Sequence, residues 1–185
     1  MKIFIDGSAG TTGLRIKDRL MKRSDVELTT LSEEQRKDTE SRKQALNSAQ
    51  VAFLCLPDAA AVEAVELVEN PDTVIIDTST AHRTSEGWAY GFPELSAEFE
   101  DKIKNSKRIA GGFIALVYPL VEAGVLGNDA LLSCYSLTGY SGGGKKMIAE
   151  YESENKSPLL FAPRQYGLTQ QHKHLKEMKG ITGIE

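Results

Sequence analysis

The sequence predicts an α/β protein built on a doubly wound parallel sheet, followed by a second, α+β lobe that we expect to be incomplete in this sequence. Short apolar runs alternate with helical segments over residues 1–77, which is the order of βαβ units with right-handed crossovers. The pattern Gly7-x-x-Gly10-x-x-Gly13 lies between the first apolar run and the first helical segment, the position that it takes in Rossmann-type sheets. The length of 185 residues suffices for one buried core and a smaller lobe.

Strands and helices alternate in the first half of the chain. The continuous apolar run 51–56 is too short for a helix and indicates a buried parallel strand. Ser32, followed by Glu33 and Glu34, predicts the cap and acidic first turn of a helix. The expected strands cover residues 3–5, 26–31, 51–56 and 74–76, and the expected helices cover residues 14–22, 32–47 and a segment from Asp58 onward.

The second half of the chain has a different character. We expect a loop over residues 87–93, helices over 97–104, 113–123 and 145–154, a strand over 131–140, and a loop or strand over 158–179. We therefore divide the chain into a dinucleotide-binding Rossmann domain, residues 1–104, and a partial substrate and catalytic domain, residues 105–185.

The charge and composition exclude several classes of protein. Lys and Arg number 22 against 26 Asp and Glu, so the net charge of −4 offers no basic surface for nucleic acid or anionic lipid. No apolar run approaches the roughly 18 residues that span a bilayer, and Gly and Asp come too early for a signal peptide. We expect a cytoplasmic protein with no nucleic-acid or membrane partner, in which Cys55 and Cys134 are reduced thiols.

The glycine pattern predicts a dinucleotide site rather than an ordinary glycine-rich turn. Glycines let the backbone approach a pyrophosphate, and the helix that follows offers free N–H groups. Ser32, Arg36 and Lys37 follow the second strand and suit a 2′-phosphate, which favours NADP over NAD, although Glu33 and Glu34 oppose this. The residues expected to bind the cofactor are Gly7, Ser8, Gly10, Thr11, Thr12, Gly13, Ser32, Arg36, Lys37, Leu56 and Pro57.

Two segments predict anion sites for a substrate. Arg83 follows a run of hydroxyl residues at the end of the fourth strand, where it is either a fork for phosphate or carboxylate or a surface arginine beside a helix cap. A glycine run with two lysines at a helix start suits phosphate, or is a flexible loop with solvated side chains. The candidates are Ser79, His82, Arg83, Ser141, Gly142, Lys145 and Lys146.

A histidine pair near the end of the chain is a candidate acid–base group. His172, His174 and Glu177 form a His-x-His-x-x-Glu pattern, in which the carboxylate could orient one ring. Two histidines can also share a metal, but no third ligand is evident nearby, so we predict no metal site.

Five motifs occur in one order that resembles the shorter bacterial type of N-acetyl-γ-glutamyl-phosphate reductase, a family related to aspartate-semialdehyde dehydrogenase. They are Gly-Ser-Ala-Gly-Thr-Thr-Gly at 7–13, Asp-Thr-Ser-Thr-Ala-His-Arg at 77–83, Tyr-Gly-Phe-Pro-Glu-Leu at 90–95, Gly-Tyr-Ser-Gly-Gly-Gly-Lys-Lys at 139–146 and His-Lys-His-Leu at 172–175. The resemblance runs over essentially the whole chain and implies a homo-oligomer.

The resemblance implies an NADPH-dependent reduction in arginine biosynthesis. A cysteine thiolate attacks the acyl phosphate of N-acetyl-γ-glutamyl phosphate, phosphate leaves, and hydride reduces the thioester to N-acetylglutamate 5-semialdehyde. The resemblance assigns the acid–base role to His174, with Glu177 supporting it. It assigns Arg83, Ser141, Lys145 and Lys146 to the phosphate or carboxylate of the substrate.

The sequence departs from this family at the nucleophile. The family carries its cysteine in an Asn-Pro-Gly-Cys-type loop, expected between Ala110 and Gly112, and this loop is absent. Cys55 and Cys134 lie in apolar runs elsewhere, where burial makes a thiol inert. Lys176 replaces a usual Pro, and the family continues beyond residue 185.

Two interpretations of this departure remain. The one we prefer is that the working polypeptide contains a loop and later segments beyond these residues, and an intact mass near 20.2 kDa would refute it. The other is that the polypeptide lacks its nucleophile and is inactive. The alternative functions are a non-catalytic NADP-binding module or redox sensor, and a relative of aspartate-semialdehyde dehydrogenase.

Overall fold

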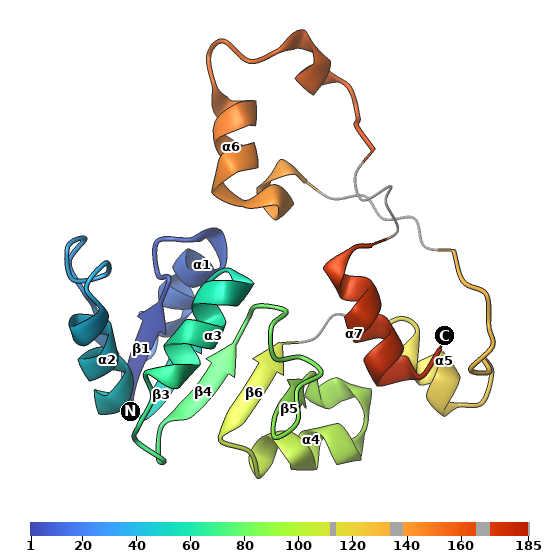
Figure 1. Ribbon diagram of the computed structural model, residues 1–185, viewed down its shortest axis with the longest axis horizontal. Coiled ribbons are helices and arrows are strands. Elements are labelled where there is room, and N and C mark those ends of the chain that lie inside the picture. Colours follow the sequence, from blue (N-terminus) through green and yellow to red (C-terminus); the bar gives the residue numbers. More distant parts are fainter. Residues whose placement is uncertain (112–113, 134–138, 166–170, 185) are drawn as a thin grey trace.

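Six parallel strands form the centre of the molecule in the computed structural model (Figure 1), which describes residues 1–111, 114–133, 139–165 and 171–184. The strand order is β2-β1-β3-β4-β6-β5, and every neighbouring pair is parallel. The predicted doubly wound α/β fold is therefore confirmed. The strands are β1 Lys2–Asp6, β2 Glu27–Thr29, β3 Val51–Leu54, β4 Val74–Asp77, β5 Ala89–Gly91 and β6 Arg108–Gly111.

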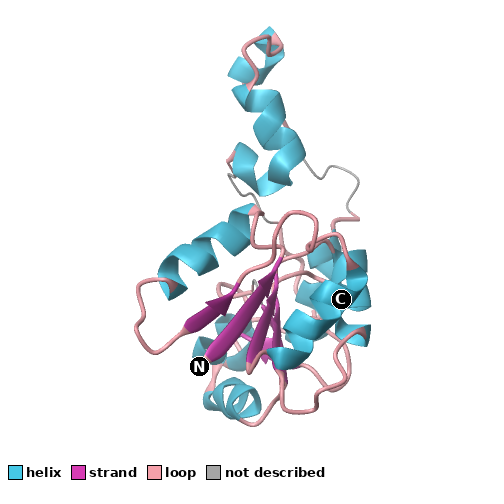
Figure 2. Cartoon of the chain, turned by 90° about the vertical axis from the view of Figure 1, so that its left-hand side faces the viewer, coloured by secondary structure: helices cyan, strands magenta, loops and turns pink. Residues whose placement is uncertain are grey.

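Helices flank the sheet on both sides (Figure 2). Short 3-10 helices cover Pro93–Leu95, Tyr140–Gly143 and Pro158–Phe161. The α-helices are α1 Thr11–Leu20, α2 Thr39–Ser48, α3 Asp58–Glu66, α4 Ala97–Lys104, α5 Tyr118–Glu122, α6 Gly144–Glu152 and α7 Lys173–Thr182. Among these, α4 has the predicted bounds, because its apolar positions recur with helical spacing between clear boundaries.

The main core lies between the central strands and the helices α2 and α3. Leu46 of α2 and Leu54 of β3 are fully buried, and each contributes about 1.5–3 kcal/mol through the hydrophobic effect. Ala61 and Ala64 are also fully buried on α3, and their small side chains let this helix approach the sheet closely. This rigid core holds the carboxyl ends of the strands at one edge, where ligands bind in open parallel sheets.

The predicted helix over residues 32–47 begins later than expected. Its cap is Asp38, whose carboxylate accepts a hydrogen bond from the Ser41 backbone N–H at 2.7 Å, and α2 starts at Thr39. Ser32 instead closes a turn, because its hydroxyl donates to Glu34 at 2.8 Å. The polar side chains after β2 compete for backbone and neighbouring groups, and this favours turns over helix.

Two strands depart from the sequence prediction. The segment 87–93, predicted as a loop, contains β5, and the strand β6 was not predicted. Both are short, and they pair with each other from Ala89 and Ile109 to Gly91 and Gly111. Strand β6 lies beyond the predicted domain boundary at residue 104 but belongs to the same sheet, so the division at that residue stays a prediction.

The last third of the chain also differs from expectation. The helix predicted over 113–123 is reduced to α5, because Pro119 in its first turn prevents extension toward the N-terminus. The segment 158–179, predicted as loop or strand, ends in α7, which His172 caps and Gly183 terminates in the left-handed conformation. Residues 131–133, predicted as strand, have no regular structure, and residues 134–138 lie outside the described residues.

Helix α6 stands apart from the sheet, as Figure 1 shows. It begins one residue before the predicted helix and is joined by stacked rings of Tyr140 and Tyr151 to the 3-10 helix that precedes it. None of the helices in the described ranges is long and apolar enough to cross a membrane.

Candidate functional site

The glycine-rich turn after β1 has the geometry of a phosphate cradle. Gly7 has a φ of 83°, and a Cβ atom there would lie 2.2 Å from the carbonyl oxygen of Cys55. A Cβ atom at Gly13 would lie 2.4 Å from the carbonyl oxygen of Gly7, so α1 approaches the turn as only glycine permits. Gly10 precedes α1 and provides no side-chain cap, which leaves the N–H groups of the first turn to another acceptor. These residues fit the pyrophosphate of a dinucleotide.

Two further residues of the predicted cofactor set lie beside this turn. The Leu56 side chain lies close to Gly7, and Pro57 lies between the end of β3 and the first residue of α3. Ser8, Thr11 and Thr12 belong to the turn and the first residues of α1, and both threonines are exposed. The structure thus brings the phosphate-binding part of the prediction together at one edge of the sheet.

The turn after β2 holds the other predicted cofactor residues. The Nε of Arg36 lies 3.4 Å from the carbonyl oxygen of Ser32, and Lys37 is exposed. The Glu34 carboxylate accepts from the Ser32 hydroxyl, and its pKa is lowered by a backbone hydrogen bond and by Ser32. An ionised carboxylate suits a ribose 2′-OH, whereas Arg36 and Lys37 suit a 2′-phosphate, so the preference for NADP stays a prediction.

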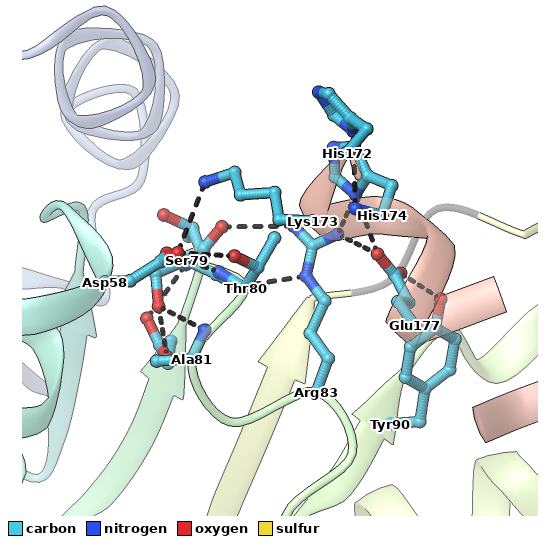
Figure 3. Close-up of polar contacts among 12 residues, drawn as sticks. Asp58, Ser79, Thr80, Ala81, Arg83, Tyr90, His172, Lys173, His174 and Glu177 are labelled. Atoms are coloured by element: carbon cyan, nitrogen blue, oxygen red, sulfur yellow. Dashed lines mark hydrogen bonds and ion pairs between the residues drawn. The ribbon is translucent and has the colours of Figure 1, made fainter. Parts of the chain in front are cut away.

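A four-residue cluster joins the loop after β4 to α7, and Figure 3 shows its contacts. We call Arg83, Tyr90, His174 and Glu177 the Glu177 cluster. One oxygen of Glu177 accepts from Arg83 Nη1 at 2.5 Å and lies 2.8 Å from His174 Nδ1. Its other oxygen accepts from the Tyr90 hydroxyl at 2.5 Å. Glu177, predicted to support His174, therefore also pairs with Arg83, which was predicted to bind substrate.

The Glu177 carboxylate is ionised in this environment. Burial alone would raise the pKa of Glu177, since its side chain is only 2% exposed. Hydrogen bonds from Tyr90, His174 and Arg83, together with the charge of Arg83, outweigh burial and hold that pKa below its ordinary value.

The Glu177 carboxylate also determines which nitrogen of the His174 ring carries the proton. Nδ1 lies 3.2 Å from Arg83 Nη1 and 2.8 Å from the carboxylate, and it cannot both accept from the first and donate to the second. The shorter, charge-assisted contact favours Nδ1–H donating to Glu177. Nε2 is then the nitrogen through which this ring would exchange a proton with a substrate.

A second network fixes the loop that carries Arg83. The buried Asp77 carboxylate accepts from the Ser79 hydroxyl and contacts His82 Nδ1, both at 2.7 Å. The His82 ring stacks on Trp88 at 4.2 Å between centroids. Arg83 in turn donates to the carbonyl oxygens of Thr78 and Ser79. Ser79 and His82 stay predicted substrate ligands, but their placement favours a supporting role behind Arg83.

A cavity of about 500 Å³ lies beside the Glu177 cluster. Its volume falls within the range of small-molecule sites. The lining includes Thr80 from the loop after β4, Asp58 from α3, and His172, Lys173 and Lys176. Asp58 accepts from Thr80 at 2.9 and 2.7 Å and pairs with Lys173 at 3.5 Å, which ties α3 to α7. The two lysines suit an anionic ligand.

Four predicted substrate residues lie elsewhere. Ser141 and Gly142 belong to the 3-10 helix before α6, and Lys145 and Lys146 start α6. All four are exposed, and the structure does not bring them to Arg83, because α6 stands away from the sheet (Figure 1). Their contact with substrate stays a prediction.

The cysteines and the nucleophile position complete the predicted set. Burial raises the pKa of the Cys55 thiol to about 11, as expected for a thiol in an apolar run. Cys134 and Gly112 lie outside the described residues. Gly111 ends β6, and Ala110 pairs with Asp77, so the expected position of the cysteine loop is at the same sheet edge as Arg83. Within the described residues no group of three His, Cys, Asp or Glu could hold a metal ion.

The sequence prediction did not include two residues that shape this site. Tyr90 belongs to the segment predicted as a loop, and its hydroxyl could be assigned only once β5 placed it under α7. Asp77 begins the motif at 77–83, but the motif alone assigns it no role. A carboxylate at the carboxyl end of a buried strand nevertheless lies where ligand sites form in open parallel sheets.

Comparison with known proteins identifies the family. Residues 2–105 match the profile described as "Semialdehyde dehydrogenase, NAD binding domain", and residues 109–183 match "Semialdehyde dehydrogenase, dimerisation domain". The chain belongs to the semialdehyde dehydrogenase family. Its first domain is therefore an NAD(P)-binding domain, as the glycine turn indicates.

Individual relatives agree with the resemblance drawn from the five motifs. A protein of Chelativorans sp. named N-acetyl-gamma-glutamyl-phosphate reductase is 50% identical over 96% of this chain and 59% of its own length. A protein of Mesorhizobium japonicum with the same name is 47% identical over 99% of this chain and 61% of its own length. The chain thus spans about three fifths of the relatives that it matches.

Solved structures share the fold at lower identity. Aspartate semialdehyde dehydrogenase II from Vibrio cholerae superposes with a TM-score of 0.60 at 16% identity, covering 98% of this chain and 66% of that one. The enzyme from Francisella tularensis gives 0.61 at 18% identity, covering 97% and 56%. At this identity the likeness establishes the fold alone.

Proposed function

We propose that this protein supplies the nucleotide-binding and acid–base groups of an NADP-dependent N-acetyl-γ-glutamyl-phosphate reductase of arginine biosynthesis. The observation that carries this proposal is the Glu177 cluster, which joins His174 and Arg83 at the sheet edge that also holds the glycine turn. The names of the relatives support the choice of substrate over that of aspartate-semialdehyde dehydrogenase.

The roles of this chain's own residues follow from their contacts. Glu177 fixes Nδ1 of His174, so that Nε2 would give a proton to the substrate oxygen as hydride adds to the thioester, and would take that proton back as the hemithioacetal releases the thiolate and becomes the aldehyde. Tyr90, His174 and Arg83 together hold the pKa of Glu177 below its ordinary value, and Arg83 brings a positive charge beside His174. Lys173 and Lys176 line the adjacent cavity, where they would bind the carboxylates or phosphate of the substrate.

The glycine turn would hold the cofactor, which supplies hydride when bound. Gly7, Ser8 and Gly10 to Gly13 would surround the pyrophosphate, and the turn after β2 would contact the adenosine ribose. Leu56 and Pro57 would line the same crevice at the end of β3.

The thioester step requires a nucleophile that the described thiol does not provide. With a pKa of about 11, Cys55 is thiolate in only about one molecule in 10⁴ at pH 7. The loop expected between Ala110 and Gly112 would bring a cysteine to the end of β6, the strand next to β4 and Arg83.

A pair of insertion variants tests the proposal. Asn-Pro-Gly-Cys is inserted after Ala110 in one variant and Asn-Pro-Gly-Ser in the other, and phosphate-dependent reduction of NADP⁺ by N-acetylglutamate 5-semialdehyde is followed. We expect activity with the cysteine insertion and none with the serine insertion or the parent chain. Activity in neither, with NADPH still bound, would reject the reductase.

One alternative is a dinucleotide-binding module without thioester chemistry, because Ala110 is followed directly by Gly111 and Gly112 with no cysteine between them. That function predicts NADPH binding together with inactivity of both insertion variants. We also propose that the protein is a homo-oligomer, because its second matched region is described as a dimerisation domain. We propose a cytoplasmic location on separate grounds, the names of biosynthetic reductases among its relatives. Size-exclusion chromatography with light scattering would refute the oligomer by giving a monomer mass across micromolar concentrations.

A further inference from the structure

A buried ion pair lies directly behind the glycine turn. Asp6 ends β1, one residue before Gly7, and its side chain is 5% exposed. Arg42 of α2 donates to a single oxygen of this carboxylate, through Nε at 3.1 Å and through Nη2 at 2.9 Å. The Arg42 side chain is 13% exposed. This pair joins α2 to the carboxyl edge of β1, and neither residue belongs to the site described above.

The strand register places this pair at the sheet edge where both halves of the proposed cofactor site lie. β1 and β2 are parallel, and Phe4 pairs with Thr29. Asp6 lies two residues beyond Phe4, and Ser32 lies three residues beyond Thr29, so both follow the paired segment at the same edge. In Figure 1, α2 lies beside β1 at this side of the sheet. Arg42 therefore lies beside the residue that precedes the phosphate-binding turn, at the sheet edge that the segment expected to contact the ribose also reaches.

The contacts of Arg42 leave it able to bind a second anion. A guanidinium has five N–H groups, and the two bonds to Asp6 use one edge of the fork. Among the described residues, Nη1 of Arg42 has no acceptor within hydrogen-bond distance. Asp6 holds the side chain in place, so less conformational freedom would be lost on binding a ligand than with an unanchored arginine.

We propose that Arg42, held by Asp6, is the residue that recognises the 2′-phosphate of NADP. This assignment rests on the proposed function, since it requires the glycine turn to hold the cofactor. The 2′-phosphate is then recognised not by the half-buried Arg36 and the exposed Lys37 but by an arginine that Asp6 anchors and whose side chain is only 13% exposed. A phosphate contact is stronger where solvent screens it less.

The test compares dissociation constants for NADPH and NADH, measured by fluorescence titration on the full chain. In Arg42→Met we expect NADPH to bind about tenfold or more weakly, the scale of one charge pair in a partly buried site, while NADH changes by less than about twofold. Arg42→Met leaves the buried Asp6 carboxylate without its counter-charge, which destabilises the fold. The same two dissociation constants are therefore also measured in the double variant Asp6→Asn/Arg42→Met, which removes both charges of the pair.

Two controls separate recognition from a structural role. Lys43→Met changes the next residue of α2, whose partner Glu69 is exposed, and should leave both constants unchanged. Arg36→Met should reduce the preference for NADPH less than Arg42→Met does. Equal weakening of NADPH and NADH in both Arg42 variants would overturn the assignment and leave the proposed function intact. Failure of the parent chain to bind either dinucleotide would overturn the proposed function as well.

Discussion

Replacement of Glu177 by alanine tests the physical basis of the Glu177 cluster. The wild-type carboxylate is 2% exposed and accepts from Arg83, His174 and Tyr90. In Glu177→Ala, the Arg83 guanidinium, itself 11% exposed, loses its counter-charge. Breaking a buried pair by removing one partner costs about 3–5 kcal/mol. For a chain of this length that corresponds to a decrease in Tm of about 6–20 °C.

The assay is thermal unfolding followed by circular dichroism, with Glu98→Ala as the matched control. Glu98 also pairs with a cation, Lys102, but both side chains are more than half exposed, so its removal should leave the Tm nearly unchanged. The reasoning is refuted if Glu177→Ala lowers the Tm by no more than the control does.

The same carboxylate predicts a pH dependence. The folded-state pKa of Glu177 lies below its ordinary value of 4.5, so its stabilising contribution is complete above that value and is lost as the pH falls through the folded pKa. The difference in Tm between wild type and Glu177→Ala should therefore shrink on acidification below pH 4.5, as the pH falls through the folded-state pKa. A difference that grows instead would contradict an ionised carboxylate in the native state.

Three further predictions concern the cofactor site and the thiol. Gly7→Ala should abolish NADPH binding and lower the Tm, because the new Cβ atom would lie 2.2 Å from the carbonyl oxygen of Cys55. The control is Gly87→Ala, where φ is a similar 78° but the space around the Cβ position is open. This control should reduce the free energy of unfolding by only about 1–2 kcal/mol and leave NADPH binding unchanged. Glu34→Gln should strengthen NADPH binding relative to NADH by a few-fold in fluorescence titrations, because it removes a negative charge near Ser32. An unchanged ratio of the two dissociation constants would exclude Glu34 from the proposed cofactor site. In a Cys134→Ser background, alkylation of the half-buried Cys55 by iodoacetamide should be slow at pH 7 and accelerate toward pH 11, and rapid labelling at neutral pH would show that the pKa of the thiol is not raised.

Local sequence patterns were sufficient for the nucleotide-binding sheet. Strand β3 is a continuous apolar run, β1 and β4 each contain one of three residues, and Gly7 and Gly13 mark the turn between β1 and α1. Each of these features can be predicted from the sequence because it depends on residues that are close together in the chain. A strand buried on both faces needs consecutive apolar side chains, and the tight turn needs residues without a Cβ atom. Each of the five motifs is also a short local stretch of sequence, and the family profiles and relatives confirm the resemblance that these motifs carry.

The functional contacts depended instead on groups far apart in the chain. Tyr90 lies 87 residues from Glu177, and Arg83 lies 94 residues from it. No spacing rule predicts such pairs, nor the link between Asp6 and Arg42, because they form only where the sheet and the helices α2 and α7 meet. The sequence by itself determined the fold class and the glycine-rich turn between β1 and α1. The tertiary structure decided which carboxylate is buried with which cation, since burial and distance, rather than residue type, set the strength of those charges.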